Sequence, residues 1–101
     1  MKTIMDILHN CYKKNENIVS KIIDDMCILV PMKNNVNDTQ GIFYLNEVGM
    51  FIWNNIDGKK TLSEIRDLII ENFDATREES GQDLIEFIEQ LENTRKIVLV
   101  K

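Results

Sequence analysis

Hydrophobic and polar residues follow two different periods along this chain, and the change between them divides it into two halves. The first half contains three short runs rich in apolar residues, which are typical of β-strands: residues 18–24, 26–30 and 41–45. Asp24 and Asp25 stand between the first two runs, where a tight hairpin would turn. Pro31 ends the second run, because proline cannot donate to a β-ladder. The polar segment 33–40 predicts a loop before the third run.

The second half repeats its hydrophobic residues at helical spacing in three successive segments. Asn46 is a favourable N-cap for the first helix, which Asp57-Gly58 closes. Two capping boxes, in which a hydroxyl and a carboxylate satisfy exposed backbone amides, open the other two helices: Thr61-Leu62-Ser63-Glu64 and Thr76-Arg77-Glu78-Glu79. The last helix carries an apolar stripe of Leu84, Phe87, Ile88 and Leu91. Residues 97–100 predict a terminal extended segment.

The N-terminal residues 1–15 are ambiguous. Helical spacing places several apolar residues on one stripe: Ile4, Ile7, Leu8, Cys11 and Tyr12. We therefore expect an N-terminal extension with a short helix, ahead of one domain over residues 16–101. This helix either packs on the core or serves for self-association into a homodimer, and the sequence leaves both open.

The order of the elements indicates the fold class. Strands and helices occupy separate parts of the chain, which favours the α+β class over an alternating α/β fold. A three-stranded antiparallel sheet followed by three helices suggests a winged helix-turn-helix arrangement. The chain has 101 residues, of which 44% are hydrophobic, and this is enough for one domain with one core.

Neither the ends nor the cysteines indicate a membrane or an oxidising compartment. The apolar runs are too short to span a bilayer, and the N-terminus lacks the core of a signal peptide. Cys11 and Cys27 stand sixteen positions apart and match no metal or redox spacing. We expect a cytoplasmic protein.

No constellation of residues points to catalysis. His9 is the single histidine and has no recognisable partner for acid–base work. The sequence lacks a Gly-rich phosphate loop and any cluster with metal-ligand spacing. We expect neither an enzyme nor a bound cofactor or metal.

The third apolar run is the first candidate binding element. It consists of Gly41, Ile42, Phe43, Tyr44 and Leu45 and leads straight into a helix through Asn46. An edge strand of this kind can pair its backbone with an extended peptide, while alternate side chains give specificity. The alternative is a strand buried on both faces that needs no ligand.

The last helix is the second candidate. Asp83, Phe87 and Gln90 lie at helical spacing on one flank of its apolar stripe, and Ile85 and Glu92 lie on the other. Either flank could line a groove beside the strand. We expect the flank with Asp83 to do so.

Charge separates peptide binding from DNA binding. Residues 46–101 contain seven Lys or Arg and twelve Asp or Glu, so the whole net charge of −5 lies in the helical half. Winged helix-turn-helix domains often bind DNA, but an acidic face is repelled by phosphates. A DNA-binding regulator and a structural or dimerisation subunit are therefore kept as alternatives, and we expect no contact with nucleic acid or membrane.

An ordered set of short motifs gives the chain a family resemblance. It comprises Leu45-Asn46, Gly49, Ile52-Trp53, Asp57-Gly58, Thr61-Leu62, Glu64-Ile65, Phe73-Asp74, Asp83-Leu84, Phe87-Ile88 and Leu91. In this order and spacing, residues 15–100 resemble the pyrroloquinoline quinone biosynthesis protein D (PqqD-like) family. That family is also known as the precursor-peptide recognition element of ribosomally made, modified peptides (RiPPs).

The resemblance implies a function as well as a fold. It implies a non-catalytic adaptor that binds the leader of a precursor peptide as an added strand, in a groove between 41–45 and 76–94. It also implies delivery of that peptide to a partner, such as a radical S-adenosylmethionine (SAM) enzyme or the protease and cyclase of a lasso-peptide pathway. The acidic last helix then predicts Lys or Arg in the leader. The family usually has a glycine after this helix, where this chain has Thr94-Arg95-Lys96-Ile97.

Overall fold

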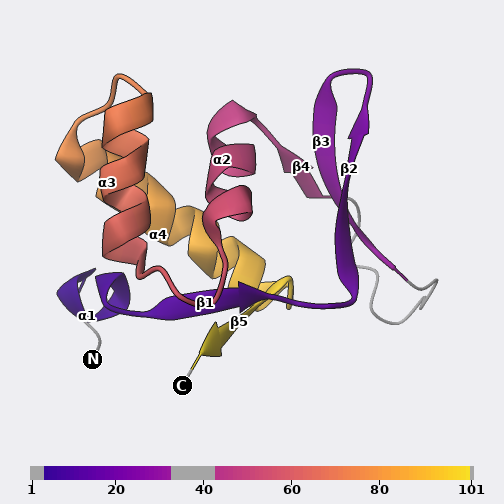
Figure 1. Ribbon diagram of the computed structural model, residues 1–101, viewed down its shortest axis with the longest axis horizontal. Helices are drawn as coiled ribbons and strands as arrows, with labels where there is room; N and C mark the ends of the chain where they lie inside the picture. The colour runs from indigo at the N-terminus through magenta and orange to yellow at the C-terminus, as the bar shows by residue number, and fades with distance from the viewer. Residues whose placement is uncertain (1–3, 33–42, 101) are drawn as a thin grey trace.

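The three helices of the second half pack beside a small antiparallel sheet (Figure 1). The computed structural model describes residues 4–32 and 43–100. Its helices are α1 (Ile4–Leu8), α2 (Glu47–Asn55), α3 (Leu62–Asn72) and α4 (Arg77–Asn93), and its strands are β1 (Cys11–Lys14), β2 (Ile18–Ile23), β3 (Met26–Pro31), β4 (Phe43–Leu45) and β5 (Ile97–Val100). The α+β class and the three-stranded sheet followed by helices are confirmed.

The three-stranded sheet has the order β2-β3-β4, with both pairs antiparallel. The β2–β3 hairpin turns at Asp24 and Asp25, whose φ angles are 50° and 67°. Positive φ at both central residues is the mark of a type I′ turn, whose twist matches that of the strands. In Figure 1 this hairpin stands away from the helices, and β4 lies between the two. Of the predicted third strand, Gly41 and Ile42 lie outside the described residues.

The predicted caps position the helices. Asn46 Oδ1 accepts a hydrogen bond of 2.7 Å from the Gly49 amide, so β4 passes into α2 with a single residue between them. The capping box of Thr61 and Glu64 is complete at the start of α3. At α4 the structure shows one of the two expected bonds, from the Glu79 amide to the Thr76 hydroxyl at 3.1 Å.

The core is built mainly from the helices. Trp53 of α2 lies buried beside the fully buried residues Leu29, Ile56, Leu62, Ile65, Leu84, Ile88 and Leu91. Three of the four residues predicted for the apolar stripe of α4 belong to this set, and the fourth, Phe87, is only half-buried. The difference matters because a half-buried aromatic ring at the end of a core can also line a binding surface.

The helical expectation for the N-terminal stripe is wrong beyond Leu8. Cys11 and Tyr12 belong to β1, which pairs antiparallel with β5, so that Tyr12 lies opposite Leu99. Helical spacing is a local signal. Here backbone hydrogen bonds to β5, from the other end of the chain, override it. The result is a second, two-stranded sheet, in which Tyr12 enters the core.

The α4 helix ends in a Schellman turn without glycine. The Arg95 amide donates to the Glu92 carbonyl at 3.0 Å, and the Lys96 amide donates to the Leu91 carbonyl at 2.8 Å. These are the two bonds of the motif, and they require a left-handed residue between them. Arg95 fills that position with a φ of 59°.

We expect Arg95→Gly to stabilise the protein, since glycine adopts positive φ without a Cβ penalty. The free energy of unfolding should rise by about 0.5–1 kcal/mol, which urea denaturation measures. Arg95→Ala is the matched control, because alanine keeps the Cβ and should give no gain. Equal stability of the two variants would show that Arg95 is not strained.

No helix in the described part of the chain is long and apolar enough to cross a bilayer. Cys11 and Cys27 are both free thiols.

Candidate functional site

The backbone of Tyr44 faces the free edge of the sheet. Met32 directly follows β3, and its amide donates to the Asn17 carbonyl at 2.6 Å. The even-numbered residues of β3 therefore make their backbone hydrogen bonds with β2. The backbone groups of successive residues in a central strand point alternately to its two neighbours. The odd-numbered residues Cys27 and Leu29 of β3 therefore bond to β4. Their partners are Leu45 and Phe43, and Tyr44 lies opposite Ile28. The N–H and C=O of Tyr44 therefore point away from β3, towards the edge.

The side chains of β4 divide between two faces. Phe43 and Leu45 face the helices, and Leu45 is buried. Tyr44 points to the other face, where its side chain is 59% exposed. β4 is therefore not buried on both faces, and its middle residue, Tyr44, lies on the outer strand of the sheet that the described residues form.

The half-buried ring of Phe87 closes the side of β4 that faces α4. It meets Phe43 edge-to-face, with 6.0 Å between the ring centroids. Gly49 of α2 packs beside this contact: a Cβ there would lie 3.4 Å from both Leu45 Cδ2 and Phe87 Cζ, an ordinary contact distance, and 3.2 Å from Asn46 Oδ1. Strand, helix α2 and helix α4 thus meet at one aromatic wall, which we call the Phe43–Phe87 wall.

The two flanks of α4 differ in what they contact. Phe87 turns towards β4, whereas Ile85 on the opposite flank is buried in the core. Asp83 and Gln90 are exposed, one helical turn to either side of Phe87. The position of Phe87 favours the flank that we expected to line the groove, and the roles of Asp83 and Gln90 stay predictions.

Lys96 is a site residue that the sequence analysis did not select. It is only 3% exposed, and its ammonium lies 5.2 Å from the centroid of the Phe43 ring. Burial lowers the pKa of this lysine below its usual value, because the charged form loses solvation. The one signal in the sequence was the replacement of the expected glycine region by Thr94-Arg95-Lys96-Ile97, which places a lysine directly before an apolar strand.

A buried ammonium should reduce the stability of the fold. We expect Lys96→Met to raise the free energy of unfolding at pH 7 by on the order of 1 kcal/mol, the lost cation–π contact partly offsetting the relief of burial. Since the pKa is lowered in the folded state, the cost is fully present below the folded pKa and fades as the pH rises from there towards the ordinary lysine value.

Urea denaturation at pH 7 and at pH 10 tests this expectation. The advantage of Lys96→Met over the wild type should be smaller at pH 10. A variant less stable than the wild type at both pH values would show that Lys96 stabilises the fold.

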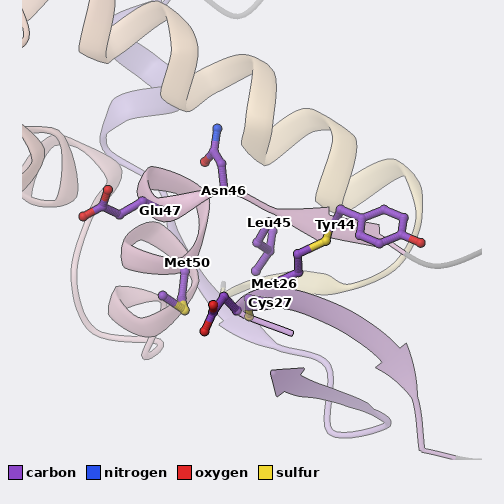
Figure 2. Close-up of a pocket in the computed structure, with 8 residues that line it drawn as sticks. Met26, Cys27, Tyr44, Leu45, Asn46, Glu47 and Met50 are labelled. Carbon is purple, nitrogen blue, oxygen red and sulfur yellow. The ribbon is translucent and has the colours of Figure 1, made fainter. Parts of the chain in front are cut away.

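A shallow hollow lies beside the Leu45 end of β4, where the strand passes into α2 (Figure 2). Apolar and sulfur-bearing side chains make up most of its wall, which consists of Asp25, Met26, Cys27, Tyr44, Leu45, Asn46, Glu47 and Met50. Glu47 and Asp25 are its two carboxylates, and no basic side chain lines it. It offers apolar contact to a bound segment that continues past Leu45.

Among the described residues no three His, Cys, Asp or Glu side chains gather as metal ligands. Asp57 has a pKa well below its usual range, because its carboxylate accepts hydrogen bonds from the side chain and amide of Lys60 and the amide of Lys59. That arrangement holds the turn between α2 and α3, and the free thiol of Cys11 lies beside it, donating to the Lys59 carbonyl at 3.4 Å.

The sheet, the three helices and the open edge of β4 define a winged helix-turn-helix domain with a surface suited to an extended peptide. Comparison with known proteins gives the family: residues 33–97 match the family model of coenzyme PQQ synthesis protein D (PqqD), and the chain belongs to this family. The resemblance drawn from the sequence is thereby confirmed.

A solved structure is similar as well, namely TbiB1 in complex with the TbiA(β) leader peptide. It has 29% sequence identity and a TM-score of 0.68, and the match covers 84% of this chain and 93% of that one. A comparison with curated proteins finds no match.

Proposed function

We propose that this chain binds the leader of a ribosomally made precursor peptide as an added strand along β4. The open edge at Tyr44 carries the proposal: its N–H and C=O are directed to the position that a further strand would occupy. Membership of the PqqD family and the similarity to TbiB1, a protein solved with a leader peptide, support it.

The groove for that strand lies between β4 and α4. On the β4 side it would include Phe43, Tyr44 and Leu45, and on the α4 side Asp83, Phe87 and Gln90. Gly41 and Ile42, also proposed from the sequence, lie outside the described residues. Backbone pairing would supply affinity, while the Phe43–Phe87 wall would contact alternate side chains of the leader. The hollow beside Leu45 would receive an apolar side chain from the part of the leader beyond the strand.

The role is that of an adaptor rather than an enzyme. The chain would present the leader to a modifying enzyme, such as a radical SAM enzyme or a lasso-type protease and cyclase. Membership of the PqqD family supports this role.

An amide NMR titration tests the proposal. The probe is the leader peptide of a precursor encoded beside this gene, and duplex DNA is the comparison. We expect shifts in β4 and along α4 with the leader and none with DNA. Shifts with DNA and none with the leader would favour a regulator. Shifts with the leader that avoid β4 would exclude strand addition at this edge.

A further inference from the structure

Lys96 occupies a position where the fold calls for a hydrophobic residue. In a Schellman turn the second residue after the C-cap packs against the third residue from the helix end. Here these residues are Lys96 and Leu91, and Leu91 is fully buried. Lys96 is 3% exposed, so most of this charged side chain is shielded from solvent. Departures of this kind from local rules concentrate at functional sites.

The backbone of Lys96 is held on both sides, which fixes the point from which its side chain starts. Its amide donates to the Leu91 carbonyl at 2.8 Å, and its carbonyl accepts from the Asn15 amide at 3.0 Å. Asn15 also donates from its side chain to the Arg95 carbonyl at 2.7 Å. From there the side chain reaches the Phe43 ring of β4.

The ammonium lies at one end of the proposed groove. The Phe43 ring that it contacts also packs edge-to-face against Phe87, a residue of α4. Within residues 4–32 and 43–100, no carboxylate forms an ion pair with Lys96. A largely buried cation that has no ion pair among the described residues, next to a surface where a strand is to be added, is suited to bind an anion brought by that strand.

We propose that Lys96 selects leaders that carry an aspartate or glutamate side chain at the position facing Phe43. The inference rests on the proposed function and names a specificity determinant within it. The carboxylate would form a charge-assisted hydrogen bond with the ammonium and relieve the cost of its burial. Basic leader residues facing the exposed carboxylates of α4 are compatible with this, because they would lie at other positions.

A peptide selection tests the inference without knowledge of the natural leader. Random 15-residue peptides displayed on phage are selected on the wild type, on Lys96→Met and on Lys14→Met. Lys14 is the matched control, because its ammonium also lies over an aromatic ring, 5.4 Å from the centroid of Trp53, but on β1. We expect Asp or Glu at one fixed position of the peptides retained by the wild type and by Lys14→Met, and not in those retained by Lys96→Met.

A double-mutant cycle then measures the contact. In the best wild-type peptide the acidic residue is changed to its amide, and affinities are compared by calorimetry. The change should weaken binding to the wild type and to Lys14→Met by about tenfold or more, and leave binding to Lys96→Met almost unchanged. Lys96→Gln replaces Lys96→Met should the methionine variant not fold.

The outcomes separate this inference from the proposed function. Retained peptides without an acidic preference would overturn the role of Lys96 and leave strand addition intact. An equal loss of affinity in all three proteins would do the same. A wild type that retains no peptide would contradict peptide binding itself, and the role of Lys96 with it.

Discussion

Tyr44→Pro should weaken leader binding by about tenfold or more while leaving the three-stranded sheet folded. Proline removes the amide that faces the open edge, and its ring occupies the space where the partner strand would approach. The bonds between β3 and β4 are made at Phe43 and Leu45, so the ladder within the domain is spared. Isothermal titration calorimetry with the leader used in the NMR titration gives the affinity.

Two controls separate the backbone of Tyr44 from other effects of the substitution. Tyr44→Ala removes the exposed ring but keeps the amide, and should bind far more tightly than Tyr44→Pro. Ser20→Pro places a proline on the opposite edge of the same sheet, since Ser20 pairs with Leu29 and its amide faces away from β3. It should bind like the wild type. Equal weakening by both prolines would point to damage of the sheet rather than loss of a docking edge.

The features that sequence predicted well are those that neighbouring residues determine. The Asp24-Asp25 turn, the Asn46 cap and the Thr61–Glu64 capping box each depend on a few consecutive residues, and the structure contains all three. The strand and helix stripes on either side follow, because burial of one face repeats with the period of the element. These local signals were enough for the α+β class.

The features that sequence missed depend on residues far apart in the chain. Cys11–Lys14 forms the strand β1 because β5, near the C-terminal end, pairs with it. The local sequence at Cys11–Lys14 does not predict this pairing. The burial of Lys96 depends in the same way on Asn15 and Phe43. Composition therefore predicted that the groove is mainly acidic, because α4 is acidic. The largely buried Lys96 at the end of the groove could be found only from the structure.

The orientation of the edge shows the same limit more sharply. Hydrophobicity selected the segment around Phe43, but it could not say which backbone groups of that segment are free. That depends on which alternate residues of β3 bond to β2 and which bond to β4. The β2–β3 register and the Met32–Asn17 bond, both outside the segment, decide this. The outward direction of the Tyr44 amide is thus a property of the whole sheet.

Phe87→Ala should lower both stability and affinity, because one ring serves the core and the groove. Its half-buried side chain forms the edge-to-face pair with Phe43, so its loss should cost about 2 kcal/mol of unfolding free energy. The same change removes the α4 side of the wall, and leader binding should weaken about tenfold or more. Urea denaturation and calorimetry measure the two effects on one preparation.

Phe73→Ala separates these two roles of an aromatic pair. Phe73 is also half-buried and meets Phe51 edge-to-face at 5.3 Å, but this pair joins α2 to the end of α3 and has no part in the wall. It should lose similar stability and keep its affinity for the leader. A Phe73→Ala variant that binds as weakly as Phe87→Ala would mean that binding follows overall stability. A Phe87→Ala variant with normal affinity would remove α4 from the groove and leave β4 as the sole binding element.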